Sequence, residues 1–368
     1  MHLPPFLLDQ WLAAHEFASP PIRYNLASST GPAWTFAELV ALDVRGLTAA
    51  LEGLKVSYVP PEGTKELRQA IGLLHDVSPD WVVVTTGASE ALSVLYCLTA
   101  EPGASIALPN PGFPAFATMA RAWGLGVTTY ELDRTQQFAQ TADLVLTAVN
   151  DKTRLVIVNS PHNPTGSVML PAEVARLSGL LAERGIPLVV DEVYHPLYFG
   201  PPMPSVASVG NTIVVSDLSK ALSLSGLRIG WLIDRDAHRR EQLINLRSYF
   251  TVSGSPITEA IAVHALAHRQ AILARLEEVT RTNLALLDEF MERQQSRFGW
   301  VRPCGGTVAF PWRLDGRDAR PMCEALARAG VLVAPGDCFE AAAHFRIGFG
   351  AQAAGFQQAL NIAARSEL

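Results

Sequence analysis

The chain alternates short, strongly apolar β-type runs with longer helical stretches from about residue 81 to residue 234, and this alternation limits the possible folds most. Seven runs are typical of strands: WVVVTT (81–86), SIALP (105–109), GVTTYEL (126–132), RLVIVNS (154–160), IPLVVD (186–191), TIVVS (212–216) and IGWLI (229–233). Stretches such as 89–100, 113–124 and 172–185 have helical patterns and lie between them. Continuous apolar runs separated by helices indicate a mostly parallel sheet with both faces covered.

The pattern changes after residue 236. Two long helical stretches at about 236–250 and 257–294 precede short strand-like pieces at 306–312, 331–335 and 344–349, with a helix at 321–330. We therefore expect an α/β protein with a large domain at 43–270 that contains a seven-stranded sheet. A smaller α+β domain should combine residues 1–42, an N-terminal arm or helix, with residues 271–368.

Composition narrows the functional classes. A formal net charge of −6 and a pI near 5.9 give no basic face for nucleic acid or anionic lipid. The chain has no apolar stretch of membrane-spanning length and no secretion signal at its start. Its four scattered cysteines form no CxxC pair, so we expect no metal site, no disulfides and a cytoplasmic location.

The chain has only four lysines, and one of them stands out by its place. Lys220 follows the strand run TIVVS, at the edge where a parallel sheet opens onto a crevice, and its neighbours are mostly Leu, Ser and Ala. Such surroundings suit a partly desolvated, nucleophilic amine. Arg228, eight residues on, can bind a phosphate dianion. When Lys220 or Arg228 is considered alone, the simpler alternative is an ordinary charged residue at the protein surface.

Other polar or aromatic side chains also follow strand runs. In TTGASEAL (85–92), the amides of Ala88 and Ser89 can receive a phosphate at a helix N-terminus, although Ser89 can equally be an ordinary helix cap. Asn163, in NSPHNPTG, can donate to a phenolate or form a simple turn. Asp191 and Tyr194, in VVDEVY, can bind a pyridinium nitrogen and a phenolate, or Asp191 can cap a helix.

Two residues have equally plausible structural roles when taken alone. Arg346, in the apolar run HFRIGF, needs an anion, which is either a substrate carboxylate or an internal salt bridge. Phe113, in PNPGFPAF, stacks on an aromatic ring or fills the core. Taken together, these motifs provide the contacts that pyridoxal 5′-phosphate (PLP) and an amino acid need, in one consistent order along the chain.

This order resembles the fold-type I PLP enzymes, and specifically the class I/II aminotransferases related to aspartate aminotransferase. The resemblance spans about residues 25–350. Its motifs are YVPPEGTKELRQAI (58–71), TTGASEAL (85–92), NPGFPAF (110–116), NSPHNPTG (159–166), DEVY (191–194), the SLSGLRIG segment after the lysine, VLVAPGDCF (331–339) and FRIGF (345–349).

The resemblance implies a PLP-dependent aminotransferase that moves an amino group between an L-amino acid and a 2-oxo acid, with Lys220 as the Schiff-base lysine. The implied cofactor-binding residues are Ala88, Ser89, Phe113, Asn163, Asp191, Tyr194, Ser219, Lys220 and Arg228. Lys220, Asp191 and Tyr194 would be catalytic, and Arg346, Gly31 and Asn163 would contact substrate. Tyr58 matches the family tyrosine that reaches the neighbouring active site, which implies a homodimer.

The sequence departs from the family pattern in three ways. Asp217 stands where the family has Ser or Thr, Glu340 replaces a glycine, and no second arginine is evident for a dicarboxylic substrate. The N-terminal layout, FLLDQWLAAHEF followed by NLASSTGPAWTFAELVALD, resembles a branch that includes capreomycidine-synthase-like enzymes, which use the same cofactor for elimination and cyclisation. A PLP-dependent lyase or cyclase is therefore the alternative.

Overall fold

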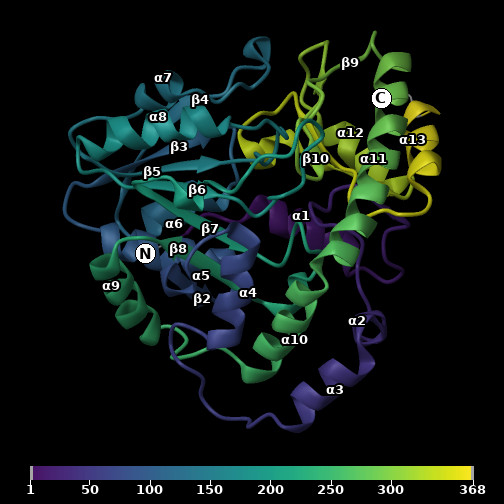
Figure 1. Ribbon diagram of the computed structural model, residues 1–368. Coiled ribbons are helices and arrows are strands. Elements are labelled where there is room, and N and C mark those ends of the chain that lie inside the picture. Colours follow the sequence, from purple (N-terminus) through teal and green to yellow (C-terminus); the bar gives the residue numbers. More distant parts are fainter. Residues whose placement is uncertain (1–2, 366–368) are drawn as a thin grey trace.

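A seven-stranded sheet forms the centre of the larger part of the molecule, as shown in the computed structural model, which describes residues 3–365 (Figure 1). In spatial order its strands are β2 (Val82–Thr85), β8 (Gly230–Asp234), β7 (Thr212–Asp217), β6 (Leu188–Asp191), β5 (Thr153–Asn159), β3 (Ser105–Asn110) and β4 (Gly126–Glu131). β8 is antiparallel to both of its neighbours, and the remaining pairs are parallel. The predicted α/β class and mostly parallel seven-stranded sheet are confirmed.

Helices cover both faces of this sheet, because successive residues of each strand point to opposite sides. In β6, Val189 packs into one apolar cluster, while Leu188 and Val190 pack into another. The first cluster includes residues of α5 (Gly87–Thr99), α6 (Ala115–Ala122) and α9 (Ala237–Ser248). The second includes residues of α4 (Lys65–His75), α7 (Ala142–Leu146), α8 (Pro171–Ala182) and α10 (Pro256–Ala267). Burial on both faces explains the uninterrupted apolar runs of the sequence.

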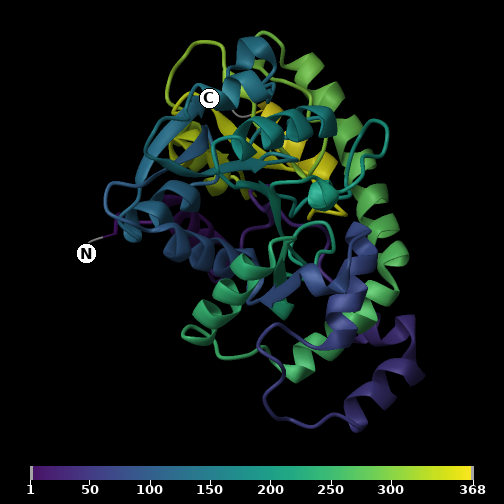
Figure 2. The ribbon, with the colours of Figure 1, turned by 60° about the vertical axis from the view of Figure 1, so that its left-hand side comes forward.

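The C-terminal part forms a second unit, in which short strands lie beside one long helix and two shorter ones (Figures 1 and 2). Its elements are α11 (Arg269–Arg293), β9 (Phe298–Gly299), β10 (Val308–Ala309), β11 (Trp312–Arg313), α12 (Arg320–Arg328), β12 (Val331–Leu332), β13 (Ala334–Pro335), β14 (Phe345–Gly348) and α13 (Phe356–Arg365). β14 pairs antiparallel with β10 and β13.

The N-terminal segment joins this C-terminal unit. Strand β1 (Tyr24–Asn25) pairs in parallel with β12, and Trp11, in α1 (Leu7–Glu16), donates from Nε1 to the Val333 carbonyl at 2.9 Å. Two further helices, α2 (Phe36–Leu42) and α3 (Val44–Glu52), then lead toward α4. These contacts agree with a small unit built from both ends of the chain, although the domain boundaries at 42/43 and 270/271 stay predictions.

The single long helix expected at 257–294 is wrong in one respect, because it divides into α10 and α11 at His268. His268 has φ −105° and ψ 19°, outside the helical range, and its Nδ1 contacts the His264 carbonyl oxygen at 2.9 Å. This contact engages a carbonyl near the end of α10, and the backbone changes direction there.

Candidate active site

The candidate active site begins at the carboxyl ends of three neighbouring parallel strands. Asn159, at the end of β5, is in register with Asp191, at the end of β6, and β7 follows beside them. The loops after these strands carry Asn163 and Lys220, so adjacency in the sheet brings together residues that are far apart in sequence.

Asp191 is 5% exposed and has no ion pair within residues 3–365. The Val193 N–H donates to its Oδ1 at 3.1 Å. Burial raises the pKa of Asp191 to about 7, and the nearby Asp217 carboxylate adds to this, while the positive charge of Lys220 opposes it. Among residues 3–365, no cation forms an ion pair with this carboxylate, and the Val193 N–H and the Lys220 charge offset its burial only in part.

Lys220 donates from Nζ to the Ser29 hydroxyl at 2.9 Å. Burial lowers the pKa of the Lys220 amine, the Asp217 carboxylate counteracts this, and the positive charge of Arg346 lowers the pKa further. A lowered pKa increases the fraction of neutral amine, which is the nucleophilic form. Ser29 was missed as a contact of this lysine, since the two residues are 191 positions apart.

The turn between β2 and α5 forms an anion cup together with Arg228. Gly87 has φ +76°, and a Cβ at this position would stand 2.6 Å from Nη2 of Arg228, so the guanidinium packs directly on the turn. Ala88 and the exposed Ser89 follow in the first turn of α5, where free N–H groups attract anions. The structure thus brings the three predicted phosphate ligands together.

Ser219, which was predicted to bind the cofactor, is engaged by a neighbouring side chain instead. Its hydroxyl donates to Oδ2 of Asp217 at 2.9 Å, and its N–H donates to Oδ1 at 2.8 Å. Asp217 is buried, and Ser219 satisfies both of its carboxylate oxygens. The Asp217 carboxylate is thereby capped by its own neighbour, and the Ser219 hydroxyl proton is already engaged in a hydrogen bond to it.

Arg346, on β14, is 1% exposed and has no carboxylate partner among the described residues. Nη1 donates to Oδ1 of Asn163 at 2.9 Å, Nη2 donates to the Ala27 carbonyl at 2.6 Å, and Nε has no hydrogen-bond partner within residues 3–365. Burial lowers the pKa of the guanidinium. A buried cation with neutral partners and a free donor is prepared for an anion.

Tyr194 is 1% exposed, and its hydroxyl lies near the Ser29 and Thr307 side chains but makes no hydrogen bond of standard geometry to any residue from 3 to 365. Burial raises the pKa of this phenol, so it stays protonated and can donate. The Asn163 oxygen is held by Arg346, which leaves the Asn163 amide nitrogen as the donor end. Phe113 lies beside this region, with its ring 6.1 Å from Phe6 and 5.5 Å from Phe116.

Two predicted contacts lie apart from this cluster or at its margin. Gly31 packs against the loop that follows Lys220, because a Cβ at Gly31 would stand 2.0 Å from the Ser223 Oγ. Tyr58 is 85% exposed, in the segment between α3 and α4. The single chain gives Tyr58 no role in its own site.

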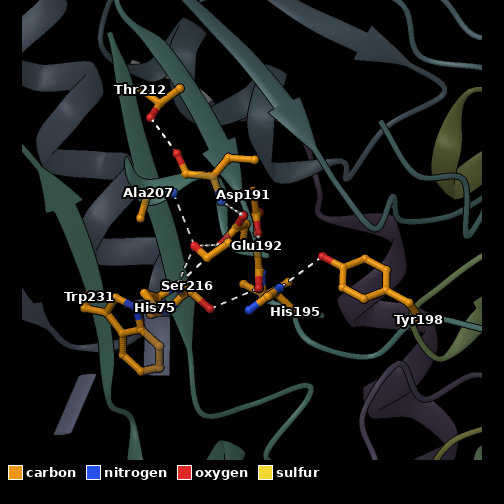
Figure 3. A network of polar contacts seen from close by, with 12 residues as sticks. His75, Asp191, Glu192, His195, Tyr198, Ala207, Thr212, Ser216 and Trp231 are labelled. Carbon is orange, nitrogen blue, oxygen red and sulfur yellow. Dashed lines mark hydrogen bonds and ion pairs between the residues drawn. The ribbon is translucent and has the colours of Figure 1, made fainter. Parts of the chain in front are cut away.

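A second polar cluster, missed in the sequence, lies next to Asp191, which Figure 3 shows beside Glu192. His75, Glu192 and His195 are buried and hold ligand-type atoms within 4.8 Å of one another, as metal ligands would. Protein groups already engage them: Trp231 Nε1 donates to His75 Nε2 at 3.1 Å, and His195 Nδ1 contacts the Tyr198 hydroxyl at 3.0 Å. This cluster therefore forms a hydrogen-bond network that supports the Asp191 loop.

Comparison with known proteins places this arrangement in a family. The profile of "Aminotransferase class I and II" matches residues 37–362. The chain belongs to this family. It is 32% identical over 353 residues to capreomycidine synthase of Streptomyces vinaceus, covering 94% of this chain and 90% of that one. It is 30% identical over 378 residues to valine–pyruvate aminotransferase of Mycobacterium tuberculosis, covering 97% and 95%.

A solved structure shows the same fold over nearly the whole chain. A PLP-dependent aminotransferase from Streptococcus suis superposes with a TM-score of 0.89 at 27% identity, covering 99% of this chain and 96% of that one. Family members depend on PLP, so the predicted family, fold type, cofactor and enzyme class are confirmed. The chain is a PLP-dependent aminotransferase.

The residues of the site fit this cofactor. Among residues 3–365, Arg346 Nε has no hydrogen-bond partner, the buried Tyr194 hydroxyl has no hydrogen bond of standard geometry, and the buried Asp191 carboxylate forms no ion pair. A phenolic oxygen, a substrate carboxylate and a protonated pyridine nitrogen are respectively the groups that would satisfy them. The Gly87–Arg228 cup has the donors that a phosphate needs. No helix within residues 3–365 has the length and apolarity needed to cross a membrane.

Proposed function

We propose that Lys220 is the residue that binds PLP covalently and that also moves the proton at the reacting carbon of an amino-acid donor. The juxtaposition of Asn163, Asp191 and Lys220 at adjacent strand ends carries this proposal. When bound, PLP acts as an electron sink for the substrate carbon. The lowered pKa of Lys220 makes its neutral amine available for attack and for proton transfer.

The remaining residues would orient the cofactor and the substrate. Asp191 would pair with the pyridine nitrogen, which supplies the cation that its buried carboxylate lacks. Asn163 and Tyr194 would donate to the ring oxygen, and Phe113 would stack on the ring. Arg346 would bind the α-carboxylate of the amino acid and of the 2-oxo acid.

The phosphate of the cofactor would lie at the N-terminus of α5. Ala88, Ser89 and Arg228 supply the donors, and the close packing of Arg228 on Gly87 supports this role. Ser219 would act mainly through Asp217, since its hydroxyl donates there. This arrangement keeps the Asp217 charge satisfied beside a phosphate.

We further propose a homodimer in which Tyr58 reaches the site of the partner. The 85% exposure of Tyr58 and the 79% exposure of Val56 support this, because exposed apolar side chains on one segment are typical of an interface. A cytoplasmic location stays a prediction from the four scattered cysteines.

The test is replacement of Lys220 by Ala, with Lys152→Ala as the matched control because Lys152 is exposed and lies in a turn. Borohydride reduction of the wild-type protein with PLP, followed by peptide mass spectrometry, should place the adduct on Lys220. The Lys220→Ala variant should lose the visible absorbance of the lysine-bound cofactor and all donor-dependent change. An adduct on another lysine would contradict the proposal.

The similarity to capreomycidine synthase keeps one alternative, a PLP-dependent lyase or cyclase on the same fold. The two reactions differ in the fate of the amino group. Transamination leaves it on the cofactor until a 2-oxo acid accepts it, whereas elimination or cyclisation leaves the cofactor unchanged over a turnover. Conversion of the cofactor to its aminated form by amino-acid donors alone supports transamination. An eliminated or cyclised product without that conversion would contradict it.

A further inference from the structure

The N-terminal segment 25–31 lies between the C-terminal unit and the loop that follows β7. On the side of the C-terminal unit, the Leu26 N–H donates to the Leu332 carbonyl at 2.8 Å. The Gly348 N–H donates to the Leu26 carbonyl at 2.7 Å. The segment therefore runs along β12 and β14 and is fixed to that unit by backbone hydrogen bonds.

The backbone around Ser29 is held by three further contacts. The Ser29 carbonyl accepts from Oγ1 of Thr307, a fully buried residue, at 2.9 Å. The Ala27 carbonyl accepts from Nη2 of Arg346 at 2.6 Å. Oδ1 of Asn25 accepts the Ala27 N–H at 3.0 Å, as in an Asx turn. These contacts fix the place of Ser29 relative to the guanidinium that is proposed to bind the substrate carboxylate.

The Ser29 hydroxyl points across this segment to the amine of Lys220. Nζ donates to Oγ at 2.9 Å, and within residues 3–365 this is the one hydrogen bond of the amine. Gly31 packs on the loop that carries the lysine, because a Cβ at Gly31 would stand 2.0 Å from the Ser223 Oγ. Direct packing therefore sets the spacing between the hydroxyl and the amine.

The direction of this hydrogen bond suits a reacting amine. The Ser29 oxygen accepts, so the contact uses an N–H of Lys220 and leaves the nitrogen lone pair free for attack. A neutral amine has two N–H groups and an ammonium has three, so the contact persists when the nitrogen gains or loses a proton. Because the lysine side chain is long and flexible, an acceptor on a fixed backbone selects one of its many rotamers.

We propose that Ser29 is a positioning residue for Lys220, and that its hydroxyl holds the amine in place whenever the amine is not bonded to the cofactor. This inference rests on the proposed function, because it needs Lys220 to be the residue that binds PLP. The segment 25–31 thereby ties the position of the amine to Arg346, so that the reacting nitrogen and the carboxylate-binding group keep one relative geometry.

Two steps use the free amine. In cofactor capture, the Lys220 nitrogen forms the bond to the aldehyde carbon of PLP, and the aldehyde oxygen leaves as water with the two amine hydrogens. In proton transfer, the nitrogen lone pair takes the proton from the α-carbon of the donor, the C–H electron pair stays with the carbon, and the same nitrogen later returns the proton. Ser29 gives up no atom in either step.

The first test measures how fast the cofactor-free protein captures PLP. Stopped-flow mixing with saturating PLP follows the visible absorbance of the lysine-bound cofactor. Ser29→Ala should slow this first-order step about tenfold, because the amine loses the one acceptor that orients it. Ser29→Thr keeps a hydroxyl and should restore most of the rate.

Two controls separate positioning from a change of structure. 4′-Deoxypyridoxine 5′-phosphate has no aldehyde, so its dissociation constant reports the phosphate and ring contacts without the lysine bond, and it should be equal in the wild type and Ser29→Ala. Ser28→Ala is the matched variant, since the Ser28 hydroxyl contacts the Thr30 hydroxyl at 2.9 Å, and it should capture PLP at the wild-type rate. Equal capture rates in the wild type and Ser29→Ala would overturn the inference. A matching loss in Ser28→Ala, or in affinity for the analogue, would overturn it as well.

The second test examines proton transfer in single turnovers with L-valine and with L-valine deuterated at its α-carbon. Ser29→Ala should lower kcat about tenfold with little change in KM, and the rate ratio between the two donors should rise because the proton step becomes slower. A change in KM alone would contradict the positioning role. The capture experiment decides alone where valine is not a donor. Failure of the wild type to capture PLP would refute the proposed function, whereas normal capture that does not depend on Ser29 would refute only this inference.

Discussion

Replacement of Asp191 by Asn should stabilise the cofactor-free protein at alkaline pH, although the residue belongs to the proposed catalytic machinery. Asp191 is 5% exposed, and among residues 3–365 its side chain accepts only the Val193 N–H. Asn has nearly the same size and keeps an oxygen for that bond. The substitution therefore removes a buried charge and little else.

The magnitude follows from the pKa of Asp191, which burial raises from 3.8 to about 7. A raised folded-state pKa contributes stability that is fully present below the unfolded pKa and is lost as pH rises through the folded pKa. At about 1.4 kcal/mol per pKa unit, the loss approaches about 4 kcal/mol above pH 7. Asn at this position does not ionise, so the variant avoids this loss.

The assay is urea unfolding of both cofactor-free proteins across pH. At about pH 4 the two free energies of unfolding should agree within about 1 kcal/mol, and at about pH 9 the variant should be more stable by about 4 kcal/mol. Asp151→Asn, at an exposed carboxylate, is the control and should show no such trend. Bound PLP should reverse the order, since its pyridinium would pair with the aspartate. A constant difference between wild type and variant across pH would refute the reasoning.

Two further substitutions test other parts of the site. Arg346→Gln should lower kcat/KM by at least about 30-fold, because a buried charge-assisted contact to the substrate carboxylate contributes about 2 kcal/mol or more. The absorbance spectrum of the bound cofactor should stay unchanged in this variant. Glu192→Gln should destabilise the protein by about 3 kcal/mol at neutral pH, since it breaks a buried network with His75. Burial alone would raise the pKa of Glu192, but the His75 hydrogen bond and the charges of His195 and His75 outweigh it, and the net result is a lowered pKa. A carboxyl group whose pKa is lower in the folded state than in the unfolded state stabilises the fold at pH values above its unfolded-state pKa. This stabilisation by Glu192 is lost as the pH falls through its folded-state pKa. Urea unfolding should therefore show the Glu192→Gln effect shrinking toward acidic pH, and an effect that grows there would contradict the network.

The sheet could be predicted from the sequence because its strands are buried on both faces. Continuous apolar runs such as Val189–Val190 identify such strands directly. The same rule places Asp191 and Lys220 at one edge, since parallel strands end together. By contrast, helices α2, α3 and α13 were not predicted.

The missed residues of the site depend on contacts between distant parts of the chain. Ser29 meets Lys220 across 191 positions, and Trp11 fixes α1 to Val333 across 322 positions. No local pattern encodes either contact, so neither could be predicted from the sequence. Tertiary packing alone determines both.

Asp217 shows a different limit. Its contact with Ser219 is local, and an aspartate that accepts the N–H two residues on is a common turn. The sequence allowed this turn, but it also allowed Ser219 to contact the cofactor. The choice depends on the burial of Asp217, which is a property of the folded sheet edge.

Asp191 and Glu192 are adjacent in sequence and both buried, yet their charges are satisfied in different ways. Glu192 accepts hydrogen bonds from Ser205 at 2.6 Å and from the Val206 N–H at 2.9 Å, and it lies 3.4 Å from His75. The protein itself therefore stabilises Glu192 as an anion, whereas burial destabilises the anion of Asp191 and raises its pKa. A buried charge that the fold satisfies is structural, and one that it leaves unsatisfied indicates where a ligand must supply the missing partner. This contrast, rather than burial or acidity alone, distinguishes the carboxylate proposed to bind the cofactor from its neighbour.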